Sequence, residues 1–129
     1  MKLQPLVGAL LCVFLASCGG DGCKMTDIVA QPANATADHN AASPGNTTQF
    51  FAHAVVPGAC STAAVLLQPD WSASDAVNVS ISSAKDATNG TATCMNATAA
   101  PVTVTATLPA SSPQSQGKTF VATAKLTCN

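Results

Sequence analysis

A strict alternation of apolar and polar residues marks the last part of the chain. Residues 102–108 read Val-Thr-Val-Thr-Ala-Thr-Leu, with the apolar side chains on even positions and the threonines on odd positions. Residues 120–128 repeat the pattern, with apolar side chains and a cysteine on every second position. Because successive side chains of a strand point to opposite faces, this period of two predicts two half-buried β-strands.

Shorter runs of the same kind fill the preceding part of the chain and are separated by turn residues. Strands are expected over residues 28–37, 47–56, 71–74, 77–82 and 91–95. Short strands at such intervals, with no helical period, predict an all-β sandwich or barrel. The connection over residues 59–69 could form a short helical turn or extend a strand.

Three details of these strands are expected from residue type. Pro32 interrupts the first strand, so that strand should lie at a sheet edge, where a missing N–H need not be paired. Val77 should face inward together with Val79 and Ile81, which alternate with polar residues. Asn89-Gly90 predicts a hairpin turn, because both residue types accept a positive φ.

The N-terminus carries an apolar segment over residues 3–16, which follows Lys2 and is interrupted by Gln4 and Pro5. A membrane-spanning helix needs about 20 apolar residues, so this shorter segment fits a secretory signal instead. The segment ends in Leu15-Ala16-Ser17-Cys18, which resembles the lipobox of bacterial lipoproteins. That resemblance implies a signal peptide over residues 1–17, lipidation of Cys18, and a lipidated tether over residues 18–27.

The lipobox resemblance also implies a location and a first partner. Several acyl chains on Cys18 would give a lasting membrane anchor, whereas one chain holds a protein only marginally. Gly19 follows the cysteine, where an Asp would resemble an inner-membrane retention signal, so the outer membrane of the bacterial cell envelope is favoured. An ordinary signal peptide with a chance cysteine near its cleavage site is the alternative.

The composition and charge of the chain exclude one class of partner. From Cys18 onward the chain contains six Asp and four Lys, and the whole chain contains no Arg, Glu or Tyr. Nucleic acid is therefore not expected as a partner, because phosphate binding depends on clustered Lys and Arg. Large apolar residues are few, so the core is small and covalent cross-links would add needed stability.

Four cysteines remain after the signal and the anchor, namely Cys23, Cys60, Cys94 and Cys128. An even number in an exported chain predicts two disulfides, with three possible pairings. A zinc site is not expected, because no two of these cysteines lie within four residues of each other and no histidine pair has ligand spacing. No metal and no cofactor are expected.

One group of motifs resembles a known family. Trp71-Ser72-Ala73-Ser74-Asp75, the following Val77 and Val79, Asn89-Gly90-Thr91-Ala92, and Val102-Thr103-Val104-Thr105-Ala106 together resemble the bacterial immunoglobulin-like domain, group 2. The resemblance implies an immunoglobulin-like β-sandwich over residues 28–129, closed by disulfides.

The same resemblance implies roles for particular residues. It places Trp71 in the core, and its strand directions imply the disulfides Cys23–Cys60 and Cys94–Cys128. The chain departs from the family at Ala100-Pro101, where a Gly-Thr pair is usual, and in an insertion over residues 59–67.

Several residues could carry chemistry, and each has a simpler structural interpretation. Asp38-His39 with Ser43 contains the residue types of a catalytic triad, but all three lie in one polar turn without the glycines that expose a nucleophile. His53 is expected as a half-packed strand residue. Trp71 could be a sugar-stacking platform, although the core is favoured.

The acidic residues Asp70, Asp75 and Asp86 could hold calcium. They are spread over 17 residues and lack the alternating spacing of a calcium loop, so a metal site is not favoured. Asp75 is expected to cap a turn instead. No catalytic residue is therefore assigned.

These observations favour a non-enzymatic, lipid-anchored cell-envelope protein that acts in adhesion, in protein or glycan binding, or as a structural module. This function rests on family analogy. One alternative is a small secreted hydrolase or metal-dependent enzyme. Another is a eukaryotic secreted glycoprotein, because Asn-x-Ser/Thr sequons occur at Asn34, Asn46, Asn78, Asn89 and Asn96.

Overall fold

The computed structural model describes residues 24–60 and 66–129, and in these two ranges the chain forms strands joined by turns. The expected all-β fold is confirmed there, since the only helical elements in these ranges are 3₁₀ turns, including Gly58–Cys60 and Pro113–Ser115. The part of the chain so described contains no helix of the length and apolarity that a membrane crossing requires.

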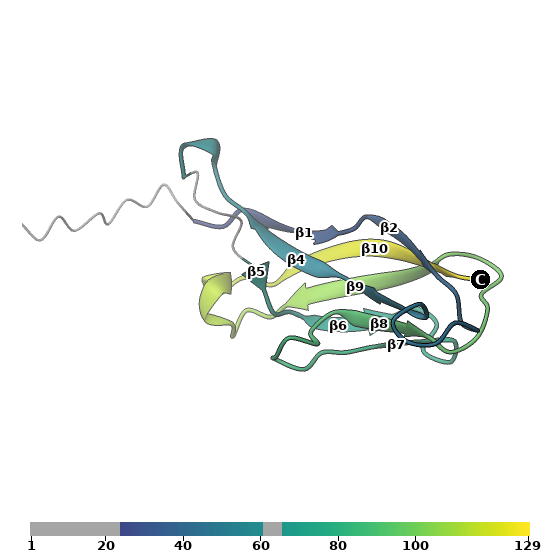
Figure 1. Cartoon of the computed structure of the whole chain (residues 1–129). Helices are drawn as coiled ribbons and strands as arrows, with labels where there is room; N and C mark the ends of the chain where they lie inside the picture. The colour runs from purple at the N-terminus through teal and green to yellow at the C-terminus, as the bar shows by residue number, and fades with distance from the viewer. Residues whose placement is uncertain (1–23, 61–65) are drawn as a thin grey trace, which may run out of the picture.

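The strands are β1 (Asp27–Gln31), β2 (Asn34–Ala37), β3 (Thr47–Gln49), β4 (Phe51–Val55), β5 (Leu66–Leu67), β6 (Asp70–Ala73), β7 (Val79–Ile81), β8 (Thr91–Cys94), β9 (Val102–Leu108) and β10 (Phe120–Cys128). They form three hydrogen-bonded sheets with the orders β1-β4-β5, β3-β8-β7 and β2-β10-β9-β6. Most strands run along one long axis, with the C-terminus at one end and the 3₁₀ turn Pro113–Ser115 at the other (Figure 1).

The alternating strands β9 and β10 pair antiparallel and carry much of the core. Phe120 lies opposite Leu108, and Leu126 lies opposite Val102. All seven residues of β9 follow the expected pattern, with even positions buried and odd positions partly exposed. Burial of Val104, Leu108 and Leu126 against the other sheets is thus set directly by the period of two in the sequence.

Two expected single strands are each divided between sheets. The strand expected over residues 28–37 breaks at Pro32, so that β1 pairs antiparallel with β4 whereas β2 pairs parallel with β10. The strand expected over residues 47–56 breaks at Phe50, which is fully buried and donates its N–H to the Gly90 carbonyl at 2.9 Å instead of to a neighbouring strand. Each break lets the chain pass from one sheet to another.

One further local expectation is wrong, and another is confirmed with a wider turn. Val77 is 77% exposed, because Asp75 accepts hydrogen bonds from the N–H groups of Val77 and Asn78 and so holds a turn where a strand was expected. The hairpin expected at Asn89-Gly90 is present, since β7 and β8 follow each other and pair antiparallel, but its turn is wider than two residues and only Gly90 of the pair has a positive φ. A Cβ at Gly90 would lie 2.3 Å from the Phe50 carbonyl oxygen, which explains the glycine.

A buried polar cluster lies behind this wide turn and is centred on Asn89, which is only 8% exposed. The Asn89 Oδ1 accepts the indole N–H of Trp71 at 3.0 Å, and its Nδ2 donates to the carbonyls of Pro69 at 3.0 Å and Ala84 at 2.8 Å. The Asn89 side chain therefore joins the segment around Pro69 and Trp71 to the turn that contains Ala84, and it satisfies the polar groups that they bury.

Candidate functional site

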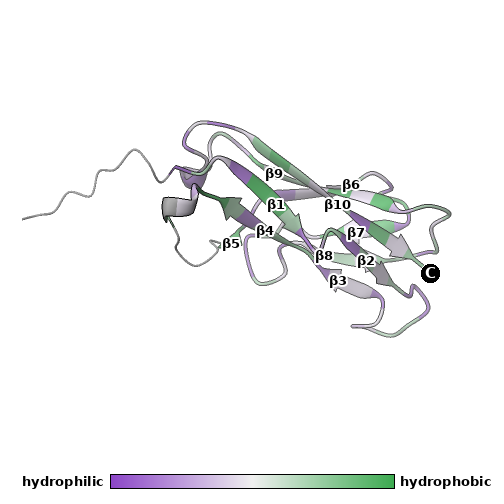
Figure 2. Cartoon of the chain, turned by 90° about the horizontal axis from the view of Figure 1, so that it is seen from above, coloured by the Kyte–Doolittle hydropathy of each residue, from purple (hydrophilic) through white to green (hydrophobic). Residues whose placement is uncertain are grey.

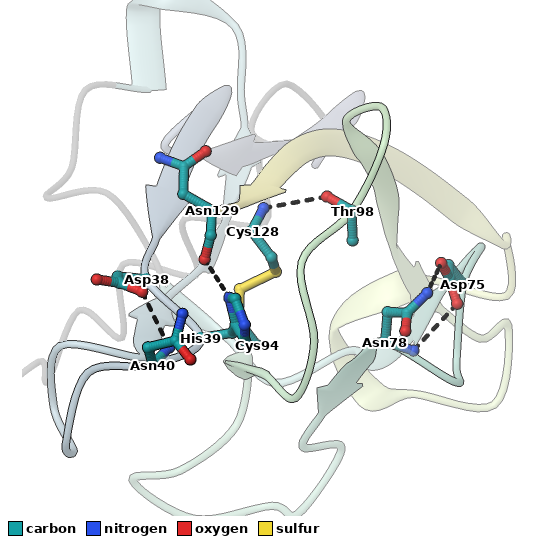
Figure 3. Close-up of a disulfide and its surroundings, with 9 residues drawn as sticks. All are labelled: Asp38, His39, Asn40, Asp75, Asn78, Cys94, Thr98, Cys128 and Asn129. Carbon is teal, nitrogen blue, oxygen red and sulfur yellow. Dashed lines mark hydrogen bonds between the residues drawn. A yellow bond between two sulfur atoms is a disulfide. The ribbon is translucent and has the colours of Figure 1, made fainter.

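The disulfide Cys94–Cys128 links two of the sheets at the end of the molecule that carries the C-terminus (Figure 3). Cys94 ends β8 and Cys128 ends β10, their Cα atoms lie 5.6 Å apart, and both residues are buried. This is the bond between these two cysteines that the family resemblance implies. Cys60 is also disulfide-bonded. Its expected partner Cys23 and the expected lipidation site Cys18 lie outside the described residues, so both remain predictions.

The segment that resembled a triad fragment holds the C-terminus in place. His39 donates its backbone N–H to the Asn129 carbonyl oxygen at 3.0 Å, and its Nδ1 also hydrogen-bonds to that oxygen. The Asp38 carboxylate accepts the N–H of Asn40 at 2.9 Å (Figure 3). Asp38 and His39 thus have structural partners of their own, which supports the interpretation of a polar turn.

The three candidate calcium ligands each serve a local role. Asp75 accepts the N–H groups of Val77 and Asn78 and the Asn78 side-chain amide, as a turn cap does. Asp86 accepts the N–H and hydroxyl of Thr88, and Asp70 pairs with Lys85. Among the described residues, no three His, Cys, Asp or Glu side chains gather in a way that could hold a metal ion.

These turn bonds affect the two capping carboxylates. The side-chain and backbone hydrogen bonds from Asn78 lower the pKa of Asp75, and those from Thr88 lower the pKa of Asp86. Because the pKa in the folded state lies below that of the unfolded chain, the stabilisation is present above about pH 4 and is lost as the pH falls further.

The two ring-bearing candidates lie in different surroundings. Trp71 is 6% exposed and its N–H is bonded to Asn89, so its expected place in the core is confirmed and it offers no platform for a sugar. His53 is half-buried on β4, with its ring centroid 6.3 Å from that of Phe51. Its Nδ1 is buried and has no hydrogen-bond partner in the described part of the chain.

A hollow of about 420 Å³ lies at the end of the molecule opposite the Cys94–Cys128 disulfide and is the candidate functional site. It is lined by Leu66, Gln68, Asp70, Lys85, Leu108, Pro109, Ser111, Ser112, Pro113 and Gln114. The start of β6, the end of β9, the turn after β7 and the 3₁₀ turn Pro113–Ser115 converge here.

An exposed ion pair lies on the wall of the hollow. Lys85 Nζ is 2.7 Å from the Asp70 carboxylate and also donates to the Gln68 carbonyl at 2.8 Å. About half of each charged side chain is exposed, so the pair itself contributes little to stability, about 0–1 kcal/mol. Its two charges balance each other, and both remain accessible to a ligand.

The other lining groups suit binding better than catalysis. Gln68, Ser111, Ser112 and Gln114 offer neutral amide and hydroxyl groups, and the Ser112 hydroxyl donates to Gln114 Oε1 at 2.6 Å. Among the described residues that line the hollow there is no histidine or cysteine, so none of them supplies an imidazole base to either serine. The volume falls within the range of about 300–1,000 Å³ typical of ligand pockets.

No pattern in the sequence indicates this hollow. Its lining comes from three stretches of chain. The alternation of apolar and polar residues assigns them to separate strands or loops, and whether they lie side by side depends on the order of the strands in the sheets. Pro109 and Pro113 indicate a shaped loop, but they do not indicate which segment that loop faces.

Comparison with known proteins adds no family to this description. No family model matches the chain, and the search of curated proteins finds no match either.

Proposed function

We propose that this chain is an exported, lipid-anchored and non-enzymatic binding domain with an immunoglobulin-like sandwich fold. The strand order supports the fold. Strands β3 and β4 follow each other over residues 47–55 and together correspond to one strand, B. With this correspondence, the order β1, β4 with β3, β8, β7 matches the A-B-E-D sheet of such domains. The neighbours β6, β9 and β10 correspond to the C-F-G sheet.

Export is supported by the buried Cys94–Cys128 bond, since structural disulfides persist mainly in oxidising compartments. Attachment to the outer membrane through Cys18 rests on the lipobox resemblance of residues 15–18. The eukaryotic glycoprotein alternative is less favoured, because one of its five sequon asparagines, Asn89, is buried and both its amide hydrogens are directed at carbonyl oxygens.

The observation that carries the binding function is the hollow beside Lys85 and Asp70. Its balanced charge and its neutral amide and hydroxyl groups suit a polar, uncharged ligand, and Leu66, Pro109 and Pro113 supply apolar contact. A glycan has this chemistry. A peptide segment of a protein partner is the second candidate, because the same groups can bind a peptide backbone. A hydrolase is not favoured, since the Ser112 hydroxyl donates to Gln114 and the described lining residues include no base beside a serine.

Binding can be tested with the full lipidated protein in detergent, using an oligosaccharide array and soluble peptidoglycan fragments as probes. We expect Lys85→Met to raise the Kd of a bound glycan by about tenfold or more, because a hydrogen bond to a charged group contributes about 1.5–3 kcal/mol.

The matched control is Lys125→Met, which removes a lysine from the outer face of β10, where Lys125 donates to Thr103 Oγ1. It should leave the Kd unchanged. Absence of binding to every probe, or equal weakening by both variants, would contradict a glycan site in the hollow. Binding of peptides instead, weakened by Lys85→Met alone, would favour the protein partner.

A further inference from the structure

The outer side of the β1-β4-β5 sheet carries three exposed apolar side chains among polar ones. Val29, His53 and Leu66 lie opposite one another in register across the three strands, and Phe51 follows on β4. Val29 and Phe51 are each 40% exposed and Leu66 is 56% exposed. We call Val29, Phe51 and Leu66 the apolar face; His53 lies among them, and Gln31 lies opposite Phe51 on the same side. Figure 2 shows the three strands next to one another, with hydrophobic segments in green.

The outer side of the other large sheet is different. There the exposed or half-exposed positions of β9 and β10 are Thr103, Thr105, Thr107, Val121, Thr123, Lys125 and Thr127. Scattered apolar residues such as Val121 are ordinary on a protein surface, whereas a contiguous apolar patch marks an interaction site. The two outer sides of the molecule therefore differ in what they can contact.

The short chain before β1 limits what can lie against the apolar face. Nine residues lead from Cys18 to Asp27, the first residue of β1. Even fully extended they span at most about 30 Å, at roughly 3.3–3.6 Å per residue. A lipid on Cys18 therefore keeps β1, which carries Val29, within this distance of the bilayer surface. The apolar face spans that strand and its two neighbours.

We propose that the apolar face rests on the lipid bilayer, with Val29, Phe51 and Leu66 at the boundary between headgroups and acyl chains. This rests on the proposed lipid anchor at Cys18. Asp27 and Gln31 flank Val29 on the same side of β1, opposite Val55 and Phe51, and in the docked protein both polar side chains would lie among the headgroups. Side chains at this boundary gain from burial of apolar area, and the anchor removes most of the cost of bringing the face to the membrane.

One consequence concerns the hollow. Leu66 belongs to the apolar face and also lines the hollow, so docking of this face would place the hollow next to the membrane surface. The ligand of the hollow would then be a glycan that lies close to the bilayer, and not one on a distant surface.

The test uses full-length lipidated protein reconstituted into vesicles of phosphatidylethanolamine and phosphatidylglycerol with brominated acyl chains, which quench tryptophan on contact. Phe51→Trp and Leu66→Trp each place a reporter on the apolar face. Val121→Trp is the matched control, because Val121 is an exposed apolar residue on the outer side of the other sheet. The buried Trp71 of the unchanged protein gives the background.

We expect the bromines to quench both reporters on the apolar face several-fold more strongly than the Val121→Trp reporter. Equal quenching of the three reporters, in protein whose lipid is confirmed by mass spectrometry, would refute membrane docking but not the lipid anchor at Cys18. A mass without lipid on Cys18 would refute the anchor and the docking together. The Cys18→Ser chain, which cannot carry the lipid, tests for dimers. If it dimerises, and Phe51→Asp dissociates the dimer whereas Val121→Asp does not, a second copy covers the apolar face and docking is refuted.

Discussion

Replacing Cys94 and Cys128 together by alanine is expected to lower the free energy of unfolding by about 4 kcal/mol, the effect of a loop closed by a disulfide between residues 34 apart. The bond joins the ends of β8 and β10, which belong to different sheets, so without it the unfolded chain gains much more freedom than the folded chain. The total free energy of unfolding of a typical domain is about 5–15 kcal/mol, so this loss would remove a large part of the stability.

The measurement is urea unfolding followed by Trp71 fluorescence, in unchanged and variant protein under the same oxidising conditions. Val121→Ala, an exposed change on the same strand β10, should stay within about 0.5 kcal/mol of the unchanged protein. A loss below about 1 kcal/mol for the double variant would show that the sheets hold together without the bond.

The second large effect is expected at Asn89. Asn89→Ala should lower the free energy of unfolding by about 3–5 kcal/mol, because each buried polar group left without a partner costs about 1–3 kcal/mol. The groups affected are the Trp71 indole N–H and the carbonyls of Pro69 and Ala84. Their environment excludes most water, since Asn89 is 8% exposed and Trp71 is 6% exposed.

Asn96→Ala is the matched control, because Asn96 is an exposed asparagine in a sequon of the same kind. Its free energy of unfolding should change by no more than about 0.5 kcal/mol. Both variants can be compared by thermal and urea unfolding, with the position of the Trp71 emission maximum as a local probe. Similar losses in the two variants would mean that the cluster around Asn89 does not stabilise the fold.

The strands could be predicted from the sequence where one face is buried along the whole length. In β9 every even position is apolar and buried, so the period of two alone identifies the strand and its inward face. Pro32 indicates the break in the first strand, but the change of sheet there and the break at Phe50 could not be predicted in the same way. They arise because the chain changes its hydrogen-bonding partner, at Phe50 from a strand to the carbonyl of Gly90, and that partner is distant in the sequence.

Local bonds and distant contacts explain the remaining differences. Val77 continues an apolar alternation, yet the Asp75 side chain holds its N–H in a turn and leaves the valine in solvent. The cysteine count alone allowed three pairings, and the choice of Cys94–Cys128 came from the family resemblance. The hollow could not be predicted at all, because Asp70, Lys85 and Gln114 meet through the arrangement of three separate segments.

Intact mass spectrometry of the protein purified from membranes, with and without reductant, tests export, anchoring and cross-linking in one experiment. We expect a chain that begins at Cys18, carries a diacylglycerol and an acyl chain, and gains four hydrogen masses on reduction of two disulfides. A chain that keeps residues upstream of Cys18, a mass without fatty acid, or a mass unchanged by reductant would contradict a lipid-anchored sandwich closed by disulfides.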